Sequence, residues 1–198
     1  MGILGRNDRI TLMMLVRKAK PEESKTIASF IFLAMEDIAY TFIGERSPEK
    51  AKQWLDSLVR MEGNQYSYKN CWVAISEEEI VAAAVVYDGG RLAELRAPVA
   101  AQIKSMFSKS FNPEDETQAG EYYIDSVGVH PERQGEGIGS KVFKFLIDTY
   151  VNDQKQTLGL LVDKDNPKAK SLYLKLGFKV VGEKALAGKE LEHMQFKT

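Results

Sequence analysis

The 198-residue sequence predicts a single α/β domain in which a mixed β-sheet is flanked by helices. Segments rich in alternating apolar residues, typical of strands, are separated by segments with helical periodicity. Some neighbouring strand segments are joined by short turns, which predicts antiparallel hairpins within the sheet. The composition, 44% hydrophobic and 28% charged, is typical of a compact globular chain.

The N-terminal half predicts a strand, two helices and a hairpin. Pro21, with acidic residues after it, marks the start of the first helix, and Ser47 followed by Pro48 marks the start of the second. Apolar residues recur at helical spacing within both segments. The predicted elements are a strand at 12–17, helices at 21–38 and 47–61, and hairpin strands at 71–75 and 80–87.

Two segments lack this regular pattern. Residues 1–11 are expected to form a flexible leader, so that the domain extends over residues 12–198. Residues 91–120 combine a helix, expected to begin near Pro98, with a polar, loop-like stretch. Because long connections in compact domains are often functional, we expect an insertion at about 91–120 beside a substrate site.

The C-terminal half alternates strands with helices. The strands are rich in Tyr, Ile and Val, and the helices show apolar residues at three- and four-residue spacing. The predicted strands are 121–129, 157–162, 178–181 and 190–196, and the predicted helices are 139–151 and 168–176.

Charge and cysteine content exclude several classes of protein. Lys and Arg number 27 and Asp and Glu 28, so the chain has no overall basic field for nucleic acid. The single cysteine, Cys71, excludes an intrachain disulfide, and two histidines argue against a zinc site. Neither a signal peptide nor an apolar stretch of about 18 residues is present. We therefore expect a cytoplasmic protein with no membrane partner and no metal.

The stretch from Val127 to Lys141 is the most informative in the chain. An apolar strand leads through Gly135, Gly137 and Gly139 into an amphipathic helix. Glycine permits positive φ and close approach, so successive N–H groups can line a concavity at a helix N-terminus. This pattern predicts a pyrophosphate cradle; glycines that serve only a tight turn are the alternative. The spacing matches neither the P-loop nor the dinucleotide-binding motif.

A second segment, residues 166–178, adds a family resemblance. Together the two segments resemble the GNAT superfamily of acetyl-CoA-dependent N-acetyltransferases. The Q/R-x-x-G-x-G/A signature of that superfamily is matched by Gln134, Gly137 and Gly139. Its later N-x-x-A-x-x-L-Y-x-x-x-G-F pattern is matched at Asn166, Ala169, Leu172, Tyr173, Gly177 and Phe178.

The resemblance implies a β-sheet that splays beyond the strand ending at Val129, with acetyl-CoA as the co-substrate. The main chain of that strand would pair with the pantetheine arm, and the N–H groups of residues 134–140 would hold the pyrophosphate. The cofactor-binding residues that it implies are Val127, Val129, Gln134, Gly135, Gly137, Gly139, Ser140 and Asn166. Glu136 departs from the basic residue often found in this loop, so we expect its carboxylate to point to solvent.

Acetyl transfer to an amine needs a base for the proton of the amine and a donor for the leaving thiolate. The resemblance implies Glu121 as the general base. Asp125, four residues later, lies on the same face if the strand is regular, and it remains an alternative base, as does water. Tyr173 matches the phenol that protonates the thiolate or holds it by a hydrogen bond.

The predicted function is direct transfer of an acetyl group from acetyl-CoA to a primary amine, on a small molecule or a peptide, within a ternary complex. A non-catalytic acyl-CoA-binding sensor is the alternative of a different class. Transfer to a hydroxyl group, or of a longer acyl chain, is a weaker one. The sequence identifies neither the acceptor nor whether the chain forms a homodimer.

Overall fold

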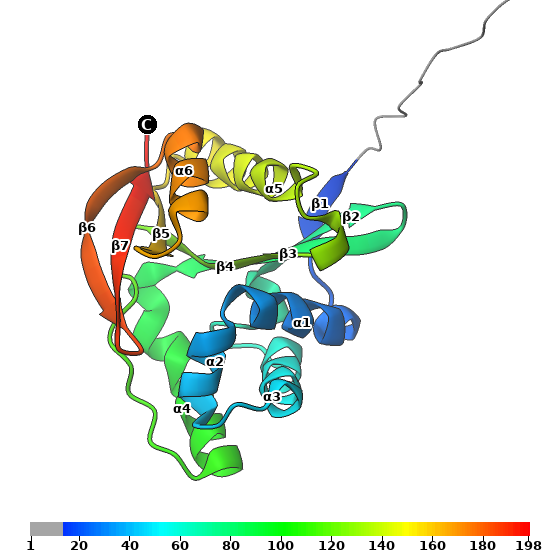
Figure 1. Cartoon of the computed structure of the whole chain (residues 1–198), viewed down its shortest axis with the longest axis vertical. Coiled ribbons are helices and arrows are strands. Elements are labelled where there is room, and N and C mark those ends of the chain that lie inside the picture. Colours follow the sequence, from blue (N-terminus) through cyan, green and yellow to red (C-terminus); the bar gives the residue numbers. More distant parts are fainter. Residues whose placement is uncertain (1–13) are drawn as a thin grey trace, which may run out of the picture.

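The computed structural model describes residues 14–198, so the predicted leader at 1–11 lies outside the described residues. A seven-stranded mixed sheet, in the order β1-β2-β3-β4-β5-β7-β6, crosses the molecule between two layers of helices (Figure 1). The strands are β1 (Leu15–Lys18), β2 (Cys71–Ser76), β3 (Glu79–Asp88), β4 (Tyr122–Val129), β5 (Leu158–Asp163), β6 (Lys179–Leu186) and β7 (Lys189–Phe196). The fold class predicted from the sequence is confirmed.

The helices divide between the two faces of the sheet (Figure 1). The first four pack on one apolar core and the last two on another, with the sheet between them. Their bounds are α1 (Ser24–Ala34), α2 (Glu36–Ile43), α3 (Pro48–Arg60), α4 (Leu92–Phe107), α5 (Ile138–Leu146, continued by a π-helical segment, Ile147–Asp153) and α6 (Pro167–Leu176). Among residues 14–198, no single helix is long and apolar enough to cross a membrane.

The prediction of a single helix at 21–38 is wrong. A short 3₁₀ turn, Pro21–Glu23, leads into α1, and the helix then breaks at Met35, whose φ of −138° and ψ of 35° are not helical. The segments on the two sides of this break are bent by 101°. Both helices bury an apolar face, so apolar residues recur at helical spacing on each side of the bend. The sequence pattern therefore does not reveal the break.

The predicted helix start near Pro98 is also wrong, because α4 begins at Leu92 and continues through the proline. The Asp88 side chain accepts a hydrogen bond from the N–H of Gly90 at 2.9 Å and caps the turn before the helix. Leu95 and Val99 are buried on the core face of α4, so packing outweighs the hydrogen bond that proline cannot donate.

The sheet opens between β4 and β5. These parallel strands pair only from Tyr122 to Ile124 on β4 and from Leu158 to Leu160 on β5. Beyond Ile124, β4 remains paired with β3 as far as Val129, but within residues 14–198 no strand pairs with it on its β5 side. The sheet is therefore splayed from the middle of β4 onward.

Helix α1 approaches the open half of β4 very closely. Gly128 lies directly against the backbone of Phe30, and a Cβ at that position would overlap the Phe30 carbonyl group. Glycine is needed here because the obstacle is main chain, which cannot rotate away as a side chain can. This contact sets how closely α1, and the bend after it, approach the splayed part of the sheet.

Gly128→Ala is expected to lower the free energy of unfolding by about 2 kcal/mol or more, because the added methyl group forces α1 away from β4. For a chain of this length, that loss corresponds to a melting temperature lower by several degrees. Gly182→Ala in β6 is the control, since its methyl group would meet no atom within 4 Å in the part of the chain that the structure describes. Equal melting temperatures for the two variants would contradict the proposed close contact.

Candidate functional site

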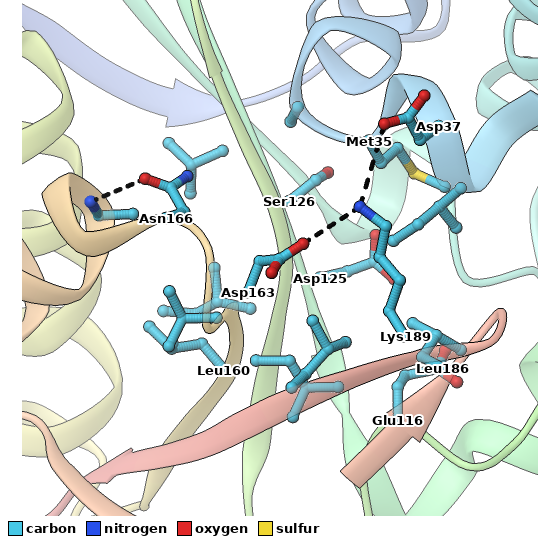
Figure 2. Close-up of a pocket in the computed structure, with 18 of the residues that line it drawn as sticks. Met35, Asp37, Glu116, Asp125, Ser126, Leu160, Asp163, Asn166, Leu186 and Lys189 are labelled. Carbon is cyan, nitrogen blue, oxygen red and sulfur yellow. Dashed lines mark hydrogen bonds and ion pairs between the residues drawn. The ribbon is translucent and has the colours of Figure 1, made fainter. Parts of the chain in front are cut away.

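A cavity of about 660 Å³ lies at the opening in the sheet. Its central part is lined by Ile124–Val127 of β4 and Leu160–Asp163 of β5. One side is formed by residues around the α1–α2 bend, including Met35, and the other by α5 and α6, including Tyr173. Figure 2 shows Asn166 on one side of β4 and Met35 and Asp37 on the other. The cavity therefore joins the two faces of the sheet.

Asp125 stands at an irregularity in β4. Val85 of β3 pairs with Ser126 and Val86 pairs with Ile124, so Asp125 is an extra residue in the β4 ladder. Such a bulge changes the direction of side chains and often occurs near functional sites. Here the bulged segment lines the cavity.

The carboxylate of Asp125 belongs to a polar network that joins several elements. The Gln65 amide and the Tyr87 hydroxyl donate hydrogen bonds to Glu116 at 3.2 and 3.0 Å, and each makes a longer one of 3.5 Å to Asp125. Arg96 forms an ion pair with Glu116. Burial, followed by the negative charge of Glu116, raises the pKa of Asp125 to about 7. A carboxylate with that pKa is suited to accept a proton near neutral pH.

Glu121, the base implied by the family resemblance, is placed differently. It is 2% exposed and is not among the residues that line the cavity. Its carboxylate accepts hydrogen bonds from His193 at 2.8 Å, Gln195 at 2.7 Å and Thr117 at 2.7 Å. Burial acts to raise the pKa of Glu121, but these hydrogen bonds outweigh it and hold the pKa below the usual range. The geometry suits a structural carboxylate, and the catalytic role of Glu121 stays a prediction.

Tyr173, the predicted thiolate partner, lies on α6 and lines the cavity. Its ring packs against Phe143, with the ring centroids 5.0 Å apart, and against Phe178 at 6.1 Å. Burial raises the pKa of Tyr173 to about 12. The phenol is therefore neutral at physiological pH and available as a hydrogen-bond donor.

Asn166 lines the same cavity and begins α6. Its side-chain oxygen accepts a hydrogen bond from the N–H of Ala169 at 3.1 Å, so it caps the helix (Figure 2). Because this oxygen is already used, the predicted contact of Asn166 with the pantetheine arm would be made by its side-chain amide nitrogen.

The glycine-rich loop lies between β4 and α5. Gly135 has a φ of 88° and Gly137, the N-cap of α5, a φ of 78°, conformations that favour glycine. The first helical hydrogen bond runs from the N–H of Lys141 to the Gly137 carbonyl at 3.1 Å, so amides of the preceding turn lack helical acceptors. Free amides at a helix N-terminus favour an anion, which fits a pyrophosphate. Ser140 lies in this first turn.

The other predicted loop features have clear positions. Glu136 is exposed, and its carboxylate accepts hydrogen bonds from Nε of Arg133 at 2.8 and 2.9 Å, which offsets its charge. The side chain of Gln134 donates to the Val129 carbonyl at 3.5 Å. Val127 and Val129 lie on the part of β4 that has no strand on its β5 side, so this edge is open to an extended ligand.

Sequence reasoning missed one side of the cavity. Lys189, at the start of β7, places its ammonium group 3.1 Å from Asp163 at the end of β5 and 3.9 Å from Asp37 at the start of α2 (Figure 2). Glu116 lies in the stretch predicted as an insertion near a substrate site. These residues belong to no local motif, so the sequence contained no signal for them beyond the position of that insertion.

Comparisons with known proteins give a consistent result. The model of the acetyltransferase (GNAT) family matches residues 35–178. Spermidine N(1)-acetyltransferase of Escherichia coli K12 is 45% identical over 58 residues, which cover 28% of this chain and 30% of that protein. Mycothiol acetyltransferase of Kytococcus sedentarius is 41% identical over 64 residues, 32% of this chain and 21% of that protein. The chain thus matches less than a third of the length of these curated relatives.

A solved structure extends the similarity to nearly the whole chain. A crystal structure described as an acetyltransferase is 30% identical, covers 92% of this chain and 98% of its own, and has a TM-score of 0.77. The opening between β4 and β5, the glycine-rich loop and the segment at 166–178 all lie within residues 35–178, which the family model matches. The chain belongs to the acetyltransferase (GNAT) family.

Proposed function

We propose that the protein transfers an acetyl group from acetyl-CoA to the primary amine of a small cationic molecule. Acetyl-CoA, which this family uses, would supply the acetyl group as a thioester. The observation that carries the proposal is that the Asp125 carboxylate and the Tyr173 phenol line one cavity at the opening of the sheet. The loop from Gln134 to Ser140 would hold the pyrophosphate, and the open edge at Val127 and Val129 would bind the pantetheine arm.

Asp125 is proposed as the base in place of Glu121. It lines the cavity, and its raised pKa lets it take a proton from the attacking amine near neutral pH. Glu121 lies outside the lining, already accepts three hydrogen bonds and has a lowered pKa. Asp125 takes the first proton of the amine and holds it as the nitrogen bonds to the acetyl carbon. As the carbon–sulfur bond breaks, the second proton of the nitrogen passes to the sulfur, which leaves as a thiol.

Tyr173 is proposed to donate a hydrogen bond to the sulfur that leaves. A phenol with a pKa of about 12 gives up its proton less readily than a thiol, whose pKa is near 8.5. Stabilisation of the thiolate by a hydrogen bond is therefore favoured over complete proton transfer from Tyr173.

The acceptor is proposed to be cationic because of the charge of the cavity. Among the described residues that line it, six are acidic and one, Lys189, is basic; the acidic residues are Glu36, Asp37, Glu116, Asp125, Asp163 and Asp165. Such a lining attracts positive ligands and disfavours anions. The similarity to a spermidine acetyltransferase supports an amine of this class.

The first prediction for the reaction concerns pH. Below its pKa of about 7 Asp125 is protonated and cannot act as a base, so kcat/KM should rise with pH through about 7. Asp125→Asn should lower kcat/KM by about 100-fold or more and remove this rise. The amine itself loses its proton only near pH 10, so the two effects separate in a pH profile.

Glu121→Gln is the comparison variant, and melting temperatures distinguish the two carboxylates. The pKa of Asp125 is higher in the folded protein than in the unfolded chain. Ionisation of Asp125 therefore destabilises the folded state increasingly from about pH 4 to pH 7. For that reason Asp125→Asn should not lower the melting temperature at pH 8. The pKa of Glu121 is lowered, so its stabilisation is present above about pH 4 and Glu121→Gln should lower the melting temperature there. If instead the Glu121→Gln variant loses the pH-dependent rise and Asp125→Asn keeps it, the base is Glu121.

The second prediction concerns Tyr173. Tyr173→Phe should lower kcat by about 100-fold while the Kd of acetyl-CoA changes little, because the hydrogen bond to sulfur strengthens as negative charge develops. Tyr150→Phe is the control: its hydroxyl accepts a hydrogen bond from Trp72 at 3.1 Å but does not line the cavity. That variant should lose stability and keep its kcat. A Tyr173→Phe enzyme with wild-type kcat would remove the phenol from the reaction.

The third prediction concerns the cradle. Acetyl-CoA should raise the melting temperature, since a ligand that binds only the folded state stabilises it, and equal stabilisation by ATP would indicate only a general phosphate site. Gly137→Ala should weaken acetyl-CoA binding about 10-fold or more, because alanine disfavours a φ of 78°.

Gly63→Ala is a matched control, since Gly63 has a φ of 77° and a methyl group added at either glycine would meet no atom of the described residues within 4 Å. Both variants should lose similar stability, and only Gly137→Ala should lose affinity. If acetyl-CoA binds the wild-type protein but no amine tested releases thiol, the non-catalytic sensor becomes the better explanation.

A further inference from the structure

The bulge in β4 affects two side chains. Val127 and Val129 pack against the core beneath α5, while Gly128 faces Phe30 of α1. Because side chains alternate along a strand, Ser126 faces the α1 side with Gly128. Asp125 also faces that side, where it meets Tyr87. The extra residue thus places two consecutive side chains, a carboxylate and a hydroxyl, on the same face (Figure 2).

The hydroxyl of Ser126 has no partner within the described part of the chain. Ser126 is 7% exposed, and its Oγ atom makes no hydrogen bond with residues 14–198. A buried polar group without a partner destabilises the folded protein and is rare, so each one needs a reason. Ser126 lines the cavity, and a ligand in that cavity is therefore a candidate partner.

Other buried polar side-chain atoms in residues 14–198 also lack partners, but they lie elsewhere. They belong to Ser24, Trp54, Gln65, Arg96 and Gln102, none of which lines the cavity. Ser126 alone among these described residues combines an unpartnered hydroxyl with a position in the cavity wall.

We infer that the Ser126 hydroxyl binds the acceptor amine beside Asp125. This inference rests on the proposed function and adds a residue to it. A protonated primary amine has three N–H bonds. Asp125 accepts the proton that is removed, and Ser126 Oγ accepts a second N–H and holds the nitrogen as it becomes neutral. After that transfer the nitrogen has two N–H bonds and a lone pair, and the hydrogen bond to Ser126 limits its rotation while the lone pair attacks the acetyl carbon. The second proton leaves the nitrogen after the N–C bond forms and passes to the departing thiolate, which becomes a thiol.

The position of Ser126 favours the amine over the cofactor as its partner. Ser126 faces the α1 side of the sheet, where the cavity is lined by Met35, Asp37 and Glu116. The glycine-rich loop leads into α5, on the opposite face (Figure 1). The acidic residues near Ser126 are also those expected to attract a cationic acceptor.

Ser126→Ala tests the inference. It should lower kcat/KM for the amine about 10-fold or more, because the hydrogen bond to the ligand is lost. The Kd of acetyl-CoA, measured by calorimetry, should not change. The melting temperature should stay the same or rise, because the hydroxyl has no partner among the described residues to lose.

Ser24→Ala is the matched control. Ser24 is 0% exposed, and its hydroxyl is likewise unpartnered within the described residues, but it does not line the cavity. Its replacement should leave both kcat/KM and the melting temperature at least at the wild-type level.

Three results would overturn the inference alone: a Ser126→Ala enzyme as active as wild type, a loss of activity matched by a fall in melting temperature, or a loss explained by weaker acetyl-CoA binding. A wild-type protein that acetylates no amine would overturn the proposed function together with the inference.

Discussion

The end of strand pairing between β4 and β5 is the constraint on which the rest of the site depends. Pairing stops at Ile124 and Leu160, and the cavity occupies the opening that follows. Unpaired strand edges normally carry a risk of association with other chains. In this fold the open edge lies inside the molecule, between α1 on one face and α5 on the other (Figure 1), where it offers main-chain groups to an extended ligand.

Two carboxylates on or beside β4 show how the surroundings decide chemical roles. Glu121 receives three hydrogen bonds, two of them from residues of β7, and remains ionised. Burial and the nearby charge of Glu116 raise the pKa of Asp125 to about 7, because its two long hydrogen bonds only partly offset them. Environments that separate the pKa values of neighbouring acids are typical of acid–base sites. Arg96 forms an ion pair with Glu116, and the charge of Glu116 contributes to the raised pKa of Asp125.

Sequence reasoning recovered what is encoded locally. The hairpin, the glycine-rich loop and the helix α6 depend on residues a few positions apart, and they lie where the sequence predicts them. The environment of Glu121 could not be predicted in this way, because its partners His193 and Gln195 are 72 and 74 residues away in the chain. The bend at Met35 and the bulge at Asp125 were missed for a related reason: neither occurs at a glycine or proline, so packing rather than local preference determines them.

The bend and the bulge together explain why two polar side chains of the site, Asp125 and Ser126, are poorly satisfied by the described part of the protein. The bend brings Met35 and Asp37 to the cavity, and the bulge turns Asp125 and Ser126 toward the same space. A carboxylate with a raised pKa and a hydroxyl without a partner in the described residues both reduce the stability of the folded chain. The tight packing of α1 against Gly128 holds this strand in place despite that loss. Two neighbouring polar side chains that the protein only partly satisfies, held on one rigid strand, are typical of a surface preorganised for a ligand rather than for folding alone.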